Sequence, residues 1–101
     1  MSHWHTKDTD ELFEAILTLQ TVEECYAFFE DACTVKEIID IAQRVRVAKM
    51  LHAGASYQTI SKETGASTAT ISRVSKFLEY GNGGYKLAIE RLQKTENENH
   101  G

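Results

Sequence analysis

The sequence predicts an all-α protein of six helices that includes a helix-turn-helix. Apolar residues recur at helical spacing in every segment, no strand-type alternation is present, and the 101-residue chain contains no proline. A third observation is the run Thr64-Gly65-Ala66-Ser67, which separates two short helical segments by a tight turn. A chain of this length usually forms one domain, so we expect residues 1–101 to fold as a single unit.

Residue types that begin and end helices mark the first three elements. Asp8-x-x-Glu11 can begin the first helix, while Thr21-x-x-Glu24 and Thr34-x-x-Glu37 are capping-box patterns for the second and third. The third helix is expected to run to about His52, before Gly54 ends it. The apolar positions of the first two helices are Leu12, Phe13, Ile16, Leu19, Val22, Cys25, Tyr26, Phe28, Phe29 and Cys33.

The helix-turn-helix is expected at about residues 56–79, with helices over 56–64 and 67–79. Gly65 can adopt the left-handed conformation that closes a helix, and Ser67 can cap the next one. Helical phase predicts that Ile60, Ala66, Ile71, Val74 and Leu78 point inward, and that Thr68, Ala69, Thr70, Ser72, Arg73 and Lys76 point outward. After the break at 82–84, a last helix carries Tyr85, Ala88, Ile89 and Leu92, and we expect the ends at about 1–6 and 95–101 to fray.

The charge of the chain is divided between acidic and basic segments. The net charge of −4 combines ten acids and two bases in residues 1–40 with one acid and six bases in residues 41–78. Attraction to phosphate is local, because salt screens it beyond about 10 Å. The basic segment coincides with the helix-turn-helix, so we interpret it as a surface that contacts DNA, although a solvated helix face with chance clustering is the alternative.

The third helix has more apolar surface than one packing layer requires. Apolar residues lie on several of its sides, and a chain this short has few helices to cover them. Together with the aromatic residues of the first two helices, this predicts a subunit interface in which two chains share a core. A well-filled monomer is the alternative. Cys25 and Cys33 lie about 12 Å apart along one helix, too far for a disulfide, and are expected to be reduced, buried thiols.

Several short stretches of the chain resemble the Trp repressor family, most closely its YerC/YecD-type branch. They are Arg44-Val-Arg46, Leu51, Gly54-x-Ser56, Gly65-Ala66 and Ala69-Thr70-Ile71-x-Arg73. The similarity is specific over roughly residues 34–80. It implies a six-helix, intertwined homodimer that presents two helix-turn-helix heads to operator DNA; the founding member binds DNA only when tryptophan occupies a site beside the recognition helix.

The resemblance also implies residue roles. Positions that match DNA-contacting residues of the family are Arg46, Tyr57, Gln58, Ser67, Thr68, Ala69, Thr70, Ser72 and Arg73. An effector pocket would involve Thr34, Arg44, Arg73, Val74 and Phe77, with the two arginines stacking on either side of an indole. Val74 stands where the founding member has glycine, and Phe77 where it has a small hydroxyl residue. Tryptophan is therefore a doubtful corepressor, although another small-molecule effector is possible.

No catalytic arrangement stands out, and we expect no enzyme activity, cofactor or metal site. His3-x-His5 is read as part of a terminus and not as a metal site. No apolar run approaches the ~20 residues of a membrane span and no signal peptide is recognisable, so a cytoplasmic location without membrane contact is expected. The predicted function is a homodimeric, sequence-specific DNA-binding regulator, a repressor because nothing resembles an activation surface. The alternative is a protein-interaction module that keeps the helix-turn-helix shape without reading DNA.

Overall fold

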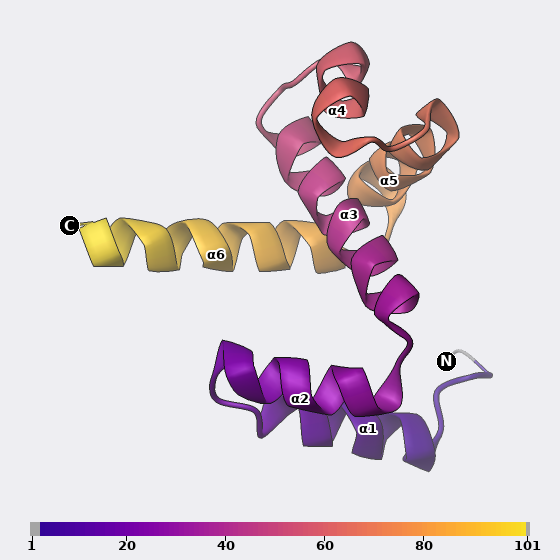
Figure 1. Ribbon diagram of the computed structural model, residues 1–101, viewed down its shortest axis with the longest axis vertical. Helices are drawn as coiled ribbons and strands as arrows, with labels where there is room; N and C mark the ends of the chain where they lie inside the picture. The colour runs from indigo at the N-terminus through magenta and orange to yellow at the C-terminus, as the bar shows by residue number, and fades with distance from the viewer. Residues whose placement is uncertain (1–2, 101) are drawn as a thin grey trace. The chain divides into compact units, whose positions relative to one another are not determined.

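The computed structural model describes residues 3–100 of the chain, and these residues form six helices and no strand (Figure 1). The helices are α1 (Lys7–Leu17), α2 (Val22–Ala32), α3 (Val35–His52), α4 (Tyr57–Thr64), α5 (Thr68–Tyr80) and α6 (Gly84–His100). The prediction of an all-α fold with six helices is confirmed. The chain divides into two compact units, Met1–Ile38 and Ile39–Gly101.

Threonine hydroxyls cap the first three helices. Thr6 caps α1 in a reciprocal pair with Thr9, so α1 begins before Asp8, where the sequence predicted its start. Thr21 caps α2 as predicted, but the Glu24 carboxylate accepts the N–H of Gln20 instead of that of Thr21. Each of these bonds satisfies a backbone N–H that has no partner inside the helix.

The capping box of α3 forms as predicted. The Thr34 hydroxyl accepts the N–H of Glu37 at 3.1 Å, and the Glu37 carboxylate accepts the N–H of Thr34 at 2.8 Å. Hydrogen bonds to the Glu37 carboxylate from the Thr34 backbone, and then from the Thr34 side chain, hold the pKa of this carboxyl below its ordinary value, because they favour the charged form.

Helices α1 and α2 bury none of their residues. Cys25 is exposed, and Cys33 is half-buried at the C-cap of α2, so the prediction of two buried thiols is wrong for the single chain. The apolar face of α2 instead lines a groove of about 260 Å³ with Val22, Cys25, Tyr26 and Phe29, together with Ile38 of α3. This face of the chain is uncovered because residues 3–38 contain too few elements to enclose it.

The buried core lies in residues 39–101. Its members are Val47 and Ala48 of α3, Ile60 of α4, Ala66 of the turn, Ile71 and Val74 of α5, and Ile89 of α6. The four predicted inward positions from Ile60 to Val74 are confirmed, and Leu78 is half-buried against this core. Burial of each larger side chain contributes about 1.5–3 kcal/mol, which holds α4 and α5 against α3.

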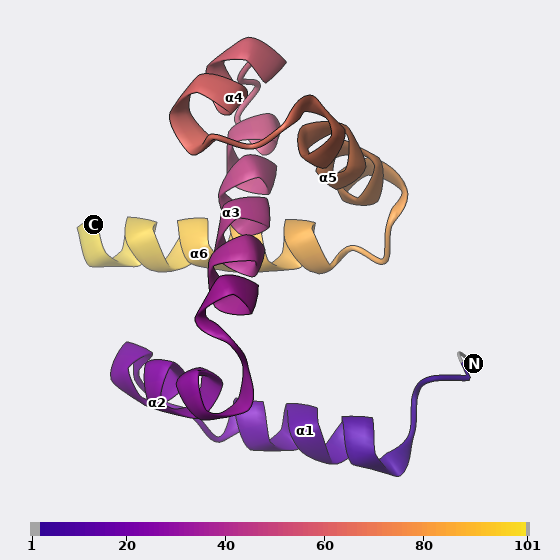
Figure 2. The same ribbon diagram turned by 45° about the vertical axis from the view of Figure 1, so that its right-hand side comes forward.

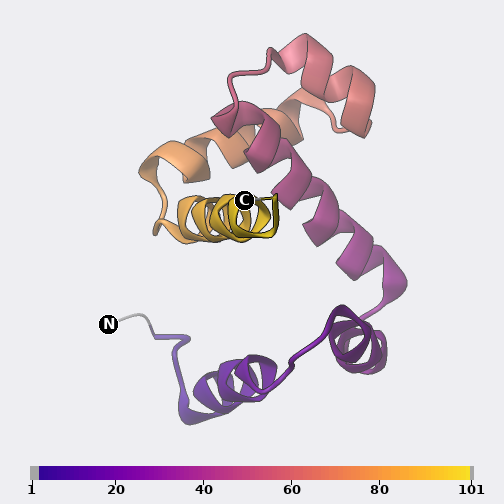
Figure 3. The ribbon, with the colours of Figure 1, turned by 90° about the vertical axis from the view of Figure 1, so that its left-hand side faces the viewer.

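Helices α4 and α5 lie beside the C-terminal half of α3 in two different views (Figures 1 and 2). Helix α6 begins beside α5 and is seen end-on in Figure 3. The sequence predicted fraying from Thr95, whereas α6 continues to His100, with the Thr95 hydroxyl donating to the Arg91 carbonyl at 3.0 Å. The predicted frayed ends also include residues 1–2 and 101, which lie outside the described residues.

Candidate nucleic-acid interface and adjoining pocket

The turn between α4 and α5 is built by Gly65 and Ser67. Gly65 has a φ of 74° and donates its N–H to the Ser61 carbonyl at 2.9 Å, which ends α4. A side chain at this φ would be strained, so glycine suits the position. The Ser67 hydroxyl then accepts the N–H of Thr70 at 3.1 Å and begins α5. Both predicted roles are confirmed.

Side chains hold this turn in place. Thr64 donates to the Ile60 carbonyl at 2.7 Å and accepts the N–H of Ala66 at 3.1 Å. Ser61 donates to the Ala66 carbonyl at 3.1 Å, and the Gln43 amide of α3 donates to the Thr64 carbonyl at 3.2 Å. These bonds satisfy partly buried backbone groups and fix the orientation of α5 relative to α3 and α4.

The residues predicted to contact DNA lie on three elements of the second unit. Arg46 is exposed on α3, and Tyr57 and Gln58 are exposed in the first turn of α4. Ser67 precedes α5, and the exposed members of α5 itself are Thr68, Ala69, Ser72 and Arg73. The outer surface of the helix-turn-helix therefore carries short polar groups together with basic ones, while Ile60, Ile71 and Val74 point into the core.

Thr70 is the exception in this set. It is half-buried, and its hydroxyl lies 3.1 Å from that of Ser67. It also lines the pocket described next, so it does not simply point outward as helical phase predicted. Helical phase distinguishes the inner from the outer face of α5. That Thr70 also borders a pocket shared with α3 is visible only in the tertiary structure.

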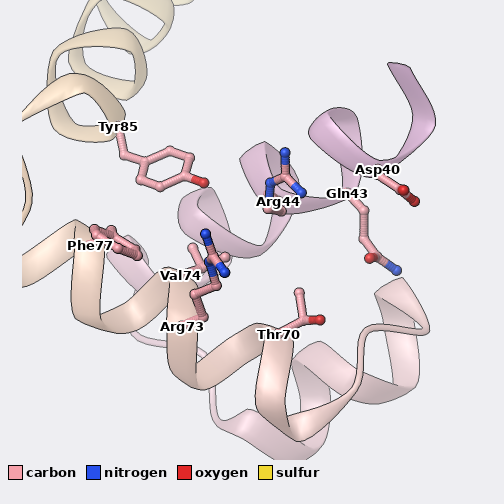
Figure 4. Close-up of a pocket in the computed structure, with 8 residues that line it drawn as sticks. All are labelled: Asp40, Gln43, Arg44, Thr70, Arg73, Val74, Phe77 and Tyr85. Atoms are coloured by element: carbon pink, nitrogen blue, oxygen red, sulfur yellow. The ribbon is translucent and has the colours of Figure 1, made fainter. Parts of the chain in front are cut away.

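A pocket of about 490 Å³ lies within the second unit, between α3, α5 and α6 (Figure 4). Four of the five residues predicted for an effector site line it: Arg44, Arg73, Val74 and Phe77. Thr34, the fifth, is not among the lining residues and caps α3 instead. Asp40, Gln43, Thr70 and Tyr85 complete the lining.

The chemistry of this pocket is mixed. The side chains of Arg44, Arg73 and Tyr85 lie around the same space in Figure 4, with the carboxylate of Asp40 and the amide of Gln43 at its edge. Val74 is buried and forms part of its wall. The guanidinium carbon of Arg73 lies 5.6 Å from the centre of the Phe77 ring, within cation–π distance. The pocket could accept a small polar or anionic molecule by hydrogen bonding.

Sequence reasoning missed the other four lining residues, for two different reasons. Asp40 precedes Arg44 by one helical turn, and Thr70 precedes Arg73 and Val74 in the same way, so spacing alone could have indicated these two residues. Gln43 comes directly before Arg44 in the sequence, so helical spacing from Arg44 did not indicate it. No such signal existed for Tyr85, which belongs to α6 and reaches the pocket only through the packing of α6 against α5.

In the part of the chain that the structure describes, no helix is both long and apolar enough to cross a membrane. Nor do three or more His, Cys, Asp or Glu side chains gather there at metal-binding distance.

Comparisons with known proteins agree on one family. The model of the Trp repressor protein family matches residues 7–93. The chain is 54% identical over 92 residues to the uncharacterized protein YerC of Bacillus subtilis (strain 168), covering 91% of this chain and 88% of YerC. A candidate Trp repressor from Staphylococcus aureus is 53% identical with a TM-score of 0.85, and the match covers 88% of this chain and 89% of that one. A TrpR-like protein from Eubacterium eligens ATCC 27750 also has a TM-score of 0.85, at 52% identity over 87% of this chain and 91% of that one.

Proposed function

Since this chain belongs to the Trp repressor family, we propose that it is a sequence-specific DNA-binding regulator, acting as a homodimeric repressor through α5 in the major groove. Members of this family are regulators and not enzymes. The observation that supports the proposal most directly is the division of α4 and α5 into two faces. The inner face packs on α3 through Ile60, Ile71 and Val74, and the outer face carries hydroxyl, amide and guanidinium groups.

The proposed contacts follow from the reach of these groups. Small residues at Ser67, Thr68, Ala69 and Ser72 allow α5 to lie close to base edges and phosphates. Gln58 at the start of α4 can pair with adenine through its amide, and Tyr57 and Arg46 can reach the DNA backbone. Residues 41–78 carry six bases and one acid, so the attraction to phosphate is local to this segment.

Selection of bound sequences from a pool of random duplexes tests the proposal. We expect a palindromic consensus whose half-sites are one helical turn apart, about 34 Å, because two symmetry-related α5 helices would read successive major grooves. Binding of the selected duplex should weaken steeply with salt, with a slope near 0.9 per phosphate contact. Failure to enrich any sequence, together with no binding at low salt, would favour a protein-interaction module instead.

Replacing Thr70 with Glu tests the position of α5 on the DNA. A carboxylate there would approach phosphate, so the selected duplex should bind more weakly by well over the ~1–3 kcal/mol of one lost base contact. Glutamate three residues after Ser67 completes a capping box, so the helix itself should not be weakened. Unchanged affinity would contradict this placement, and Thr70→Ser is the matched control.

We propose that a second copy of this chain covers the groove of α2 lined by Val22, Cys25, Tyr26, Phe29 and Ile38. Large apolar side chains are exposed on α1, α2 and α3 of the single chain, including Leu12, Phe13, Val22, Tyr26, Val35, Ile39 and Ile41. A monomer rarely exposes so much apolar surface over consecutive helices. Sedimentation at micromolar concentration should show a dimer; a stable folded monomer would contradict this assignment.

The pocket between Arg44 and Arg73 should not accept tryptophan as the founding member of the family does. The buried Val74 places a branched side chain where an indole would need an open slot, and Phe77 adds a ring beside Arg73. Overpacking of this kind costs about 1–3 kcal/mol, enough to lose a weak ligand. A differently shaped effector could still use the pocket. Calorimetry with L-tryptophan, and DNA binding with and without it, tests the expectation; micromolar affinity together with tryptophan-dependent DNA binding would contradict it.

A further inference from the structure

The outer surface of α5 extends beyond the contacts predicted from the sequence. A shallow hollow of about 550 Å³ is lined by Ala69, Ser72, Arg73, Lys76 and Phe77. These residues follow one another at helical spacing along a single face of α5. The methyl group of Ala69 and the hydroxymethyl group of Ser72 leave space in the middle of this face, and two cationic side chains border it. The shape of this hollow and its positive charge suit the sugar–phosphate backbone of DNA.

Lys76 is exposed and lies one turn after Ser72 on this face. Glu79, three residues further on, is also exposed and does not form an ion pair with it, since no salt bridge involves Lys76 among the described residues. An unpaired ammonium group on a flexible stem is the type of group that binds phosphate as a point charge.

Arg73 and Phe77 belong to two hollows at once. Both line the hollow on the outer face of α5, and both also line the pocket between α3, α5 and α6. The Arg73 guanidinium lies over the Phe77 ring, 5.6 Å from its centre. An aromatic ring in this position restricts the rotamers of a long side chain and so reduces the entropy that the side chain loses on binding phosphate.

We propose that this hollow is a phosphate site in which Lys76 contacts the DNA backbone directly and Phe77 positions Arg73 for the same purpose. The proposal rests on the proposed function, since it assumes that α5 docks in the major groove. It gives Lys76 and Phe77, which the sequence analysis placed only on the outer face of the helix and in the effector pocket, a sequence-independent role in DNA binding, because phosphates carry no base information. In this proposal Phe77 holds Arg73 beside the DNA major groove, and no bound effector is needed to do so.

Replacement of Lys76 by Gln tests the direct contact. The slope of log K against log salt should fall by about 0.9, equivalent to about a five-fold loss of affinity at 0.15 M salt. The loss should be the same on the selected duplex and on a scrambled one, whereas a residue that reads bases would affect only the selected duplex. Lys94→Gln removes the same charge from the exposed part of α6 and is the matched control.

An unchanged slope for Lys76→Gln, or an equal change for Lys94→Gln, would overturn the phosphate contact. These outcomes are separable from failure of the proposed function, because the variants are compared only after the wild-type protein has been found to bind the selected duplex with a salt-dependent affinity. If the wild-type protein binds no duplex, the docking of α5 and this site fail together.

A double-mutant cycle between Phe77→Leu and Arg73→Gln tests the positioning role. Leucine keeps an apolar side chain but removes the ring face, so Phe77→Leu should lower DNA affinity several-fold and change the salt slope in the same direction as Arg73→Gln. In an Arg73→Gln background the same leucine substitution should have no further effect, because there is no guanidinium left to position. Phe77→Trp, unlike Phe77→Leu, should keep the wild-type salt slope, since tryptophan is the best cation–π partner. Additive losses, or loss of thermal stability without a change in slope, would show that Phe77 serves packing alone.

Discussion

Seven apolar side chains are buried in the unit formed by residues 39–101, whereas α1 and α2 of the preceding unit bury none. Both parts have amphipathic helices with well-formed caps, so local structure does not account for the difference. In the second unit α3, α4, α5 and α6 each supply at least one core residue, and they enclose one another. The first unit has two short helices and the start of a third. The helix-turn-helix can therefore be organised within one chain, while the apolar residues of α1 and α2 stay exposed in the single chain.

The largest expected effect comes from a charge placed in the first unit. Phe28 is half-buried and packs edge-to-face on Phe29, with ring centres 5.3 Å apart. Phe28→Asp would bury an unpaired carboxylate in the proposed interface, and we expect the dimer to be weakened by more than about 2 kcal/mol. Sedimentation across a concentration series measures this. Glu23→Lys, a charge reversal at an exposed position of the same helix, should leave the dimer intact; equal effects of both changes would remove the distinction between the two faces of α2.

A cavity in the second unit should reduce stability directly. Ile71 is fully buried, so Ile71→Ala should lower the free energy of unfolding by about 2–5 kcal/mol. Leu17 of α1 is 83% exposed, and Leu17→Ala should change it by less than about 0.5 kcal/mol. Denaturant titration of both variants measures the free energy of unfolding after an aliphatic side chain has been truncated to alanine in each unit. Similar losses would mean that α1 is buried nearly as well as α5.

A smaller effect is expected where α5 meets the loop to α6. A Cβ at Gly81 would clash with the backbone oxygen of Phe77, so Gly81→Ala should cost about 1–3 kcal/mol by forcing the backbone apart. Gly84 has no atom within 4 Å of the equivalent position, and Gly84→Ala should be neutral or slightly stabilising. Thermal unfolding distinguishes the two. A stable Gly81→Ala protein would indicate that the junction can open without disturbing the core.

The smallest expected effect is the pH dependence of the α3 cap in the first unit. The pKa of Glu37 is lowered by the bonds to Thr34, so the charged form is favoured in the folded state. Its contribution to stability is therefore fully present above the ordinary carboxyl pKa and is lost as the pH falls through the lowered one. Glu37→Gln keeps an acceptor for the Thr34 N–H but cannot titrate. Its melting temperature should approach that of the wild type in acid and lie below it at neutral pH; identical curves would contradict a role for this charge.

Much of the second unit could be predicted from the sequence because its signals are local. A left-handed glycine at residue 65 and a hydroxyl at residue 67 define the turn through bonds that span only a few residues. Helical phase then separates inward from outward positions, which correctly placed Ile60, Ala66, Ile71 and Val74. The resemblance to the Trp repressor family was carried in part by Gly65, Ala66 and Ile71 of this segment, and the match over residues 7–93 confirmed it.

The sequence alone determined the six helices, the turn chemistry and the inner face of α5, because caps, glycines and periodicity act over at most a few residues. Only the tertiary structure decided which side chains from different helices share a space. It placed Tyr85 of α6 in the pocket, moved Thr70 to the pocket edge, left Thr34 at a helix cap and kept Cys25 exposed. Those outcomes depend on how α3, α5 and α6 pack and on what a single chain leaves uncovered, and neither is encoded in the spacing of residues along one helix.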